Sequence, residues 1–198
     1  GWRRILLRFI CDRDGRPIRA VGKVVDISSE RLLLQKSRTD ALTGAYNRAY
    51  LEHAVEKYLA QKPEEVFAAC LMIDIDHFKQ LNDSCGHLCG DTVLTDLVGM
   101  LKRLYRATDL VARLGGDEFM VFLKGNAHRD ILNRRMTDLY DAMGKYPKIP
   151  ISCSAGIAFV EREGFQYEKS LLQADMALYK SKQGGKSYFS YAEDQKQN

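Results

Sequence analysis

The sequence predicts an α+β protein whose main part is a ferredoxin-like, polymerase-palm-like antiparallel sheet with surrounding helices. From Asp40 onward, strand and helix patterns follow one another in the order β-α-β-β-α-β, which is the ferredoxin-like layout. The continuous apolar run Phe67–Ile75 is typical of a central strand buried on both faces. Two further apolar stretches, 110–112 and 119–123, enclose a Gly-Gly pair and predict a tight hairpin.

The first 39 residues predict a β-rich segment followed by a linker. Ile5–Cys11 and Ile18–Ile27 have strand composition, and Asp14-Gly15 between them is a strong hairpin turn. A lone hairpin is only marginally stable in water. We therefore expect residues 1–27 to be the C-terminal strands of a truncated domain, residues 28–39 to form a linker helix, and residues 40–198 to form the main domain.

Apolar residues at helical spacing predict four helices in the main domain. The residues with this spacing are Leu51, Ala54, Val55, Tyr58 and Leu59; Leu94, Leu97, Val98, Leu101 and Tyr105; Leu132, Met136, Leu139, Tyr140 and Met143; and Leu171, Ala174 and Leu178. A strand is expected over 149–160, after the third helix. Gly184-Gly185 ends the fourth helix, and the tyrosine-rich stretch 188–191 can close the sheet.

Composition narrows the classes of function. The 198 residues are 45% hydrophobic and carry 30 Lys and Arg against 26 Asp and Glu, for a net charge of +4. This mildly basic balance, without long basic runs, fits phosphate-bearing ligands better than a nucleic-acid-coating surface. No apolar run approaches the roughly 20 residues that span a bilayer, and the start lacks the layout of a signal peptide. We expect a cytoplasmic protein, or the cytoplasmic part of a larger one.

The five cysteines argue against a disulfide framework, because their number is odd and they are scattered. They favour a reducing compartment. Cys85, His87 and Cys89 lack the second ligand pair of a zinc site, so we interpret them as incidental small residues of a loop.

Acidic residues stand at two strand ends that the predicted sheet can bring together. Asp74 lies at the end of the buried strand, and Asp117 and Glu118 lie at the tip of the glycine hairpin. If the two strands are neighbours, the three carboxylates converge, and such a cluster requires cations between its members. Oxygen ligands alone favour Mg²⁺ or Mn²⁺. The alternative is that these acids simply face water.

Residues that suit a nucleotide follow the central strand. Free N–H groups of a short turn at Phe78 and the cation of Lys79 suit phosphates. Asn82 and Asp91 suit a base, since a carboxylate can accept two N–H bonds from guanine but meets an acceptor on adenine. Helix capping is the alternative role for both.

Two lysines flank the glycine pair that ends the last helix. Lys182 and Lys186 can neutralise the terminal carbonyls of that helix, or they can hold the β- and γ-phosphates of a triphosphate. Their spacing alone does not separate the two roles.

An ordered series of motifs resembles the GGDEF-domain diguanylate cyclases over about residues 38–192. The motifs are Asp40-Ala41-Leu42-Thr43-Gly44 with Asn47-Arg48, Asp74-Ile75-Asp76-His77-Phe78-Lys79 with Asn82-Asp83, Gly86-His87 and Gly90-Asp91, Gly115-Gly116-Asp117-Glu118-Phe119, Ser154-Ala155-Gly156-Ile157-Ala158, and Ala174-Asp175 through Ala177-Leu178-Tyr179 to Lys182. The resemblance implies condensation of two GTP into cyclic di-GMP with release of two pyrophosphates. Each domain holds one GTP, so two domains must meet face to face in a homodimer.

The resemblance also implies roles for individual residues. Asp74, the Ile75 carbonyl and, as the first choice among the signature acids, Asp117 would bind two Mg²⁺ or Mn²⁺ ions. Glu118 would be either a further metal ligand or an aid in deprotonating the 3′-hydroxyl. Asp117, Glu118 and Lys79 are the expected catalytic residues. The expected GTP-binding residues are Asn82 and Asp91 for guanine, Phe78, Lys79, Lys182 and Lys186 for phosphates, and Gly115 and Gly116 for close approach of the backbone.

Three further expectations follow from resemblance. Arg106 and Asp109 match the Arg-x-x-Asp inhibitory site of the family, so we expect product inhibition by cyclic di-GMP, although a helix-end ion pair is the plainer interpretation. Residues 14–28 resemble the closing strands of a PAS sensor domain. Lys186 and Ser187 replace the usual arginine and asparagine, which reduces a bidentate phosphate clamp to a point charge.

Two other functions compete with an active cyclase. A domain without turnover could bind cyclic di-GMP or GTP as a sensor module. A polymerase could use the same palm layout, but the weak net charge disfavours a nucleic-acid partner.

Overall fold

The computed structural model of the chain describes residues 3–11, 15–26, 38–61, 68–125, 127–147, 149–160 and 167–192. The chain divides into two units, Gly1–Arg38 and Thr39–Asn198. The predicted linker helix at 28–36 lies outside the described residues, as do the Asp12–Asp14 part of the first turn and the Ile27 end of the second strand.

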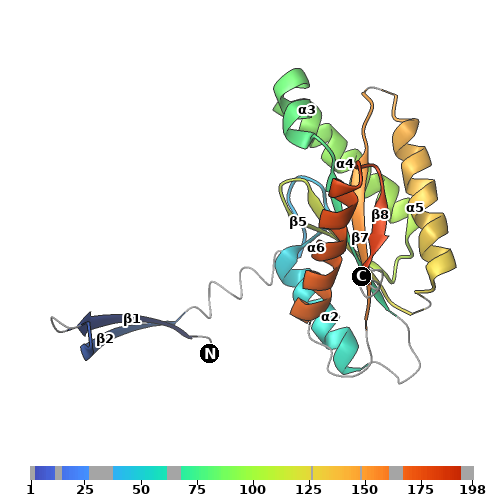
Figure 1. Cartoon of the computed structure of the whole chain (residues 1–198). Coiled ribbons are helices and arrows are strands. Elements are labelled where there is room, and N and C mark those ends of the chain that lie inside the picture. Colours follow the sequence, from blue (N-terminus) through green and yellow to red (C-terminus); the bar gives the residue numbers. More distant parts are fainter. Residues whose placement is uncertain are drawn as a thin grey trace. The chain divides into compact units, whose positions relative to one another are not determined.

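The first unit is a two-stranded antiparallel sheet (Figure 1) made of β1 (Arg3–Cys11) and β2 (Pro17–Asp26). Ile5 pairs with Val24 and Phe9 with Ala20. Since side chains alternate between the faces of a strand, these four residues share one apolar face. Ile5, Phe9 and Val24 are 64%, 59% and 58% exposed. Within this unit, therefore, the apolar face is open to solvent.

The second unit contains a six-stranded sheet in the order β3-β5-β6-β4-β7-β8. Its strands are β3 (Tyr46–Asn47), β4 (Ala69–Ile75), β5 (Leu110–Gly115), β6 (Glu118–Leu123), β7 (Cys153–Phe159) and β8 (Phe189–Tyr191). The four central strands are antiparallel, while β3 and β8 join the edges in parallel. The strands β4, β5, β6 and β7, with α4 (His87–Leu104) and α5 (Arg129–Gly144) between them, form the ferredoxin-like core, which confirms the predicted fold class.

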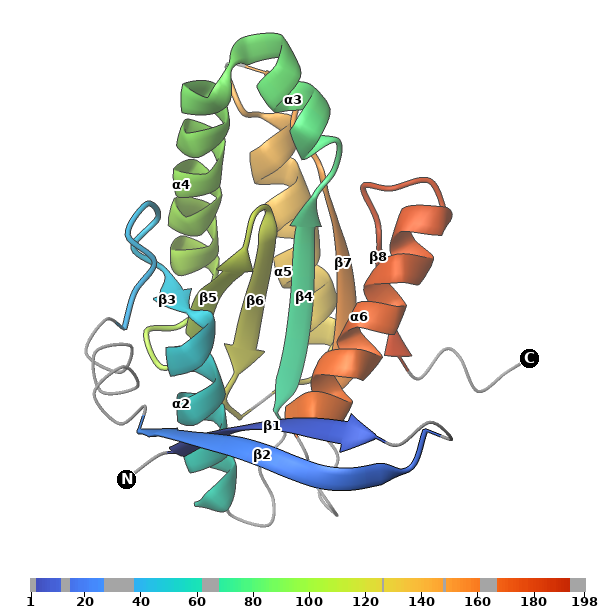
Figure 2. The ribbon, with the colours of Figure 1, turned by 90° about the vertical axis from the view of Figure 1, so that its left-hand side faces the viewer.

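Helices cover both faces of the sheet (Figure 2). On one face, Leu71 and Ile73 of β4 share a core with residues of α4 and α5. On the other, Cys70 and Met72 share a core with residues of α2 (Arg48–Ala60) and α6 (Tyr167–Gln183). Every residue of β4 is buried, as its continuous apolar run predicts.

Two local features concern the packing of α6 and the presence of an additional helix. A Cβ on Gly156 of β7 would clash with the backbone of α6 at Ala174 and Leu178, so glycine lets the helix lie directly on the strand. α3 (Phe78–Cys85) is a separate short helix where the sequence predicted only a turn. None of its eight residues is buried, so it lacks the apolar stripe by which the longer helices were predicted. Within the described ranges, every helix is too short or too polar to cross a membrane.

Candidate active site at the end of the central strand

The carboxylates of the glycine hairpin lie beside the end of β4. Asp74 stands opposite Glu118 in the β4–β6 pairing, and the backbone N–H of Ile75 donates to the carbonyl oxygen of Asp117 at 3.4 Å. Gly115 and Gly116 have φ angles of 153° and 52°, in the region that favours glycine. The hairpin and the central strand thus bring Asp74, Asp117 and Glu118 to one edge of the sheet.

Asp74 is the most confined of these acids. It is only 8% exposed, and its Oδ2 lies 2.8 Å from Nζ of Lys182 on α6. Burial raises the pKa of Asp74, the ammonium of Lys182 opposes that rise, and the charges of Asp117 and Glu118 add to it, so that the pKa is raised overall. The charged form of this carboxylate is therefore stabilised by a nearby cation.

The carboxylates do not form a ready-made metal cluster. Among the described residues, no three His, Cys, Asp or Glu side chains are arranged to hold a metal ion. The donors at this edge are carboxylate and backbone oxygens, the chemistry that Mg²⁺ and Mn²⁺ prefer. The donor set fits such an ion, and Lys182 is the cation that Asp74 contacts.

The side chain of Arg113 holds the backbone of the hairpin turn. Its Nε and Nη2 donate to the carbonyl oxygen of Gly116 at 2.9 and 2.7 Å, and its Nη1 lies 3.1 Å from Oδ1 of Asp40. Asp40 also accepts from the N–H and hydroxyl of Thr43. Burial raises the pKa of Asp40, but the hydrogen bonds from Thr43 and the charge of Arg113 together lower it below its ordinary value. Two distant motifs therefore meet at the turn that carries Asp117.

Asp76, two residues beyond Asp74, is a structural acid. Its carboxylate accepts from the hydroxyls of Ser152 and Ser154, each at 2.7 Å, and from the backbone N–H of Ser187 at 3.0 Å. Asp76 is 7% exposed. It thus ties the segment after α6 to the end of β4, a role that only the partners across the fold reveal.

The segment after α6 meets the start of α3. Lys186 and Ser187 have φ angles of 65° and 51°, and Nζ of Lys186 lies 3.4 Å from Nε2 of His77. His77, itself at φ 57°, precedes α3, which opens with half-buried Phe78 and exposed Lys79. Lys79, Lys182 and Lys186 thus border the region between the end of β4 and the N-terminus of α3, where an anion is favoured.

Asn82 and Asp91 lie on α3 and α4, two helices that share Gly86 as a cap. A Cβ on Gly90 would clash with Oδ1 of Asn82, so the two helices are in contact there. Oδ1 of Asn82 is buried and has no hydrogen-bond partner. Asp91 is half-buried, one residue beyond that contact. The spacing between the two side chains therefore depends on the angle between α3 and α4.

Comparison with known proteins assigns the fold to a family. The model of the family described as "Diguanylate cyclase, GGDEF domain" matches residues 37–188. The chain belongs to the GGDEF-domain family. The diguanylate cyclase DgcS of Shewanella oneidensis is 34% identical over 158 residues, which are 79% of this chain and 53% of that protein. DgcP of Pseudomonas aeruginosa is 38% identical over 80% of this chain and 24% of its own length. The chain thus spans about half of one relative and a quarter of the other.

Solved structures resemble the second unit closely. The GGDEF domain of TpbB (YfiN) from Pseudomonas aeruginosa has a TM-score of 0.72 and 34% identity, covering 78% of this chain and 94% of that one. The GGDEF domain of DgcB from Caulobacter crescentus, solved in complex with c-di-GMP, has a TM-score of 0.73 and 27% identity, covering 79% and 96%. Both comparisons support the GGDEF fold derived above.

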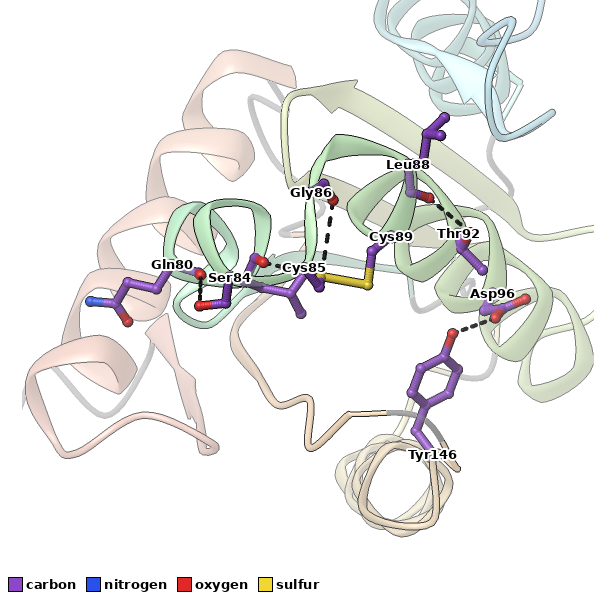
Figure 3. Close-up of a disulfide and its surroundings, with 10 residues drawn as sticks. Gln80, Ser84, Cys85, Gly86, Leu88, Cys89, Thr92, Asp96 and Tyr146 are labelled. Atoms are coloured by element: carbon purple, nitrogen blue, oxygen red, sulfur yellow. Dashed lines mark hydrogen bonds between the residues drawn. A yellow bond between two sulfur atoms is a disulfide. The ribbon is translucent and has the colours of Figure 1, made fainter.

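One prediction about this GGDEF domain was wrong. Cys85 and Cys89 form a disulfide (Figure 3), whereas the sequence argument interpreted them as incidental residues of a loop. Cys85 ends α3 and Cys89 lies in the first turn of α4, with their Cα atoms 5.8 Å apart. The unpredicted helix α3 creates this proximity. Cys11, Cys70 and Cys153 remain free thiols, and the last two are buried.

Arg106 and Asp109 line a cavity of the GGDEF domain, of about 410 Å³, together with Thr39, Gly44, Tyr46 and Lys102. Asp109 does not form the helix-end ion pair of the plainer interpretation. Its Oδ2 accepts from the backbone N–H of Arg106 at 2.9 Å and its Oδ1 from that of Lys124 at 3.1 Å. The Arg106 side chain is exposed. Asp109 thus shapes the turn that presents Arg106 to the cavity.

Proposed function

We propose that this chain is a diguanylate cyclase that condenses two GTP into cyclic di-GMP and two pyrophosphates. The observation that carries the proposal is the meeting of Asp74 with Asp117 and Glu118 beside Lys182, at the end of the central strand of a GGDEF fold. The carboxylates can bind a metal ion, and the neighbouring lysines and helix N-terminus can bind phosphate groups. This combination fits a site for a metal-bound triphosphate.

In the proposed reaction, the 3′-oxygen of one GTP attacks the α-phosphorus of the other. The new P–O bond forms as the bond to the pyrophosphate leaving group breaks, and the hydroxyl proton passes to Glu118 or to water. A second, identical step closes the ring. Because each domain offers one nucleotide, two copies must face each other, and we infer a homodimer during turnover.

Asp74, the carbonyl of Ile75, Asp117 and Glu118 would hold Mg²⁺ or Mn²⁺. Such ions, when bound, supply Lewis acidity at the α-phosphate and the 3′-hydroxyl. Lys182, whose ammonium contacts Oδ2 of Asp74, would also be a suitable partner for a phosphate group. Lys79, Lys186 and the backbone of Phe78 complete the proposed phosphate contacts, while Gly115 and Gly116 leave room for the nucleotide backbone.

Asn82 and Asp91 are the proposed guanine contacts. The carboxylate of Asp91 can accept both N–H groups on the edge of guanine, and Asn82 offers a donor and an acceptor. Arg106 and Asp109 form the proposed inhibitory site, where Arg106 grips cyclic di-GMP at the cavity and Asp109 fixes its turn.

A second candidate function is a binding module without turnover. The observation that favours it is the point charge of Lys186, which contacts His77 and cannot clamp a phosphate in bidentate fashion.

We also infer that the hairpin at residues 3–26 is the end of a PAS-type sensor domain, because its apolar face is uncovered within its own unit. Use of GTP is consistent with a cytoplasmic site of action.

The decisive test is incubation of the protein with GTP and Mg²⁺, followed by chromatographic detection of cyclic di-GMP. Asp117→Ala is expected to lower turnover by at least about 10²-fold, because it removes a transition-state stabiliser. Asp138→Ala, at an exposed position of α5, is the matched control and should retain turnover. Binding of GTP without any product at high protein concentration would favour the binding module instead.

A further inference from the structure

The disulfide between Cys85 and Cys89 lies inside the proposed guanine-binding corner. Cys85 follows Asn82 by three residues, and Cys89 precedes Asp91 by two. The bridge spans Gly86, which ends α3 and begins α4 with a φ of 86°. Figure 3 shows the two sulfur atoms joined between the consecutive helices. The bridge therefore restrains the one joint that sets the separation of Asn82 and Asp91.

The other contacts that hold α3 involve partly buried side chains. The helix has eight residues, no buried residue and no side-chain cap at its N-terminus. Phe78 and Leu81 are partly buried where they pack against the core, and Asn82 contacts Gly90 of α4. Helices this short are unstable alone and depend on tertiary contacts. A covalent link to α4, which carries seven buried residues, thus adds to the partly exposed contacts that the side chains of α3 provide.

We propose that Cys85 and Cys89 form a redox-sensitive clip, whose oxidation orders α3 against α4 and strengthens binding of the guanine nucleotide. This inference rests on the guanine roles proposed for Asn82 and Asp91. The clip acts through helix α3, so the two cysteines are positioning residues and do not touch the nucleotide.

A low-molecular-weight disulfide is the class of oxidant for the clip. The exposed Cys85 thiolate attacks one sulfur of the oxidant, forming a mixed disulfide and releasing one thiolate, which takes a proton. The Cys89 thiolate then attacks Cys85 Sγ and releases the second thiolate. Two protein thiols lose two electrons in total, and one disulfide becomes two thiols. A dithiol reductant reverses both steps.

Differences in burial among the five cysteines direct an oxidant to Cys85 and Cys89. Cys70 and Cys153 are fully buried, and burial raises the pKa of Cys70 to about 12 and that of Cys153 further, so both resist oxidation. Cys11 is the remaining exposed free thiol among the described residues. A Cys11→Ser background therefore leaves Cys85 and Cys89 as the reactive pair.

The test compares this background protein after oxidised glutathione with the same protein after dithiothreitol. Intact mass should differ by two hydrogens, and amide hydrogen exchange over 78–91 should be slower in the oxidised form. Affinity for 3′-deoxy-GTP with Mg²⁺, measured by calorimetry, should be about three- to tenfold higher after oxidation. This range corresponds to α3 being ordered in about a third to a tenth of the reduced molecules, because apparent affinity falls in proportion to the fraction that can bind.

A Cys85→Ser/Cys89→Ser variant in the same background is the matched control. It should match the reduced protein in exchange and affinity and should not respond to either reagent. Equal exchange or equal affinity in the two redox states of the background protein would overturn the clip. Absence of nucleotide binding in both states would instead contradict the proposed function, while mass and exchange would still decide whether the clip forms and orders α3.

Discussion

The guanidinium of Arg113 donates two N–H groups to the carbonyl oxygen of Gly116, at 2.9 and 2.7 Å. This contact fixes the backbone one residue before Asp117. The third nitrogen of the same guanidinium binds Asp40, which in turn holds the Thr43 turn. The orientation of the acidic tip thus depends on a residue some 70 positions earlier in the sequence.

We expect Arg113→Lys to lower kcat/KM for cyclic di-GMP synthesis by about tenfold, because an ammonium cannot reproduce the planar fork that holds both Gly116 and Asp40. Asp40→Asn should cause a smaller loss by weakening the support of Arg113. Initial rates at several GTP concentrations measure both effects. Arg103→Lys, on the exposed end of α4, is the control. Unchanged kinetics in Arg113→Lys would remove the positioning role.

The pH dependence of turnover should reflect Asp74. Because burial and the neighbouring acids raise its pKa, acidification protonates Asp74 at a higher pH than an ordinary Asp and abolishes the cation-binding form there. The acid limb of log kcat/KM against pH should therefore lie above the usual range of aspartate. Lys182→Met removes the charge that opposes the rise and should move this limb to still higher pH, whereas Lys180→Met should not. An acid limb at an ordinary aspartate pKa in the wild-type protein would contradict this assignment.

The same raised pKa makes Asp74 costly for folding. Above the ordinary aspartate pKa of 3.8, the unfolded chain releases this proton while the folded chain retains it, so stability falls as pH rises through the folded pKa. We expect Asp74→Asn to increase stability relative to the wild type at pH 7, and this advantage to vanish below about pH 3.8. Urea unfolding midpoints across this range measure it. An advantage that did not shrink on acidification would point to a cause other than titration of Asp74.

Product inhibition should depend on Arg106. Its exposed side chain lines the 410 Å³ cavity, and loss of its forked donors should weaken cyclic di-GMP binding by at least about tenfold. In Arg106→Ala, the ratio of rates with and without added cyclic di-GMP should approach one. Arg103→Ala, a nearby exposed arginine on α4, should keep the inhibition of the wild type. Inhibition that persists in Arg106→Ala would assign product binding to another site.

Much of this architecture was predictable from the sequence, because the responsible forces act locally or along a regular period. The apolar run before Asp74 predicted a strand buried on both faces, and β4 is buried throughout. The glycines at 115 and 116 predicted a tight turn, and the hairpin has one, with positive φ angles at both glycines. Helical spacing predicted α2, α4, α5 and α6, whose apolar stripes must face the sheet.

Other features were decided only by tertiary structure. Asp76 carries the same charge as Asp74 two residues away, yet the chain surrounds it with Ser152, Ser154 and the Ser187 N–H and thereby makes it a structural acid. The disulfide exists because α3 brings two ordinary-looking cysteines together across Gly86. The sequence by itself determined the central strands, the four longer helices and the inventory of charges, whereas α3 and the short edge strand β3 appeared only in the structure. Which charges meet depends on strand register and helix packing, because those contacts join residues separated by tens of positions and carry no local signal.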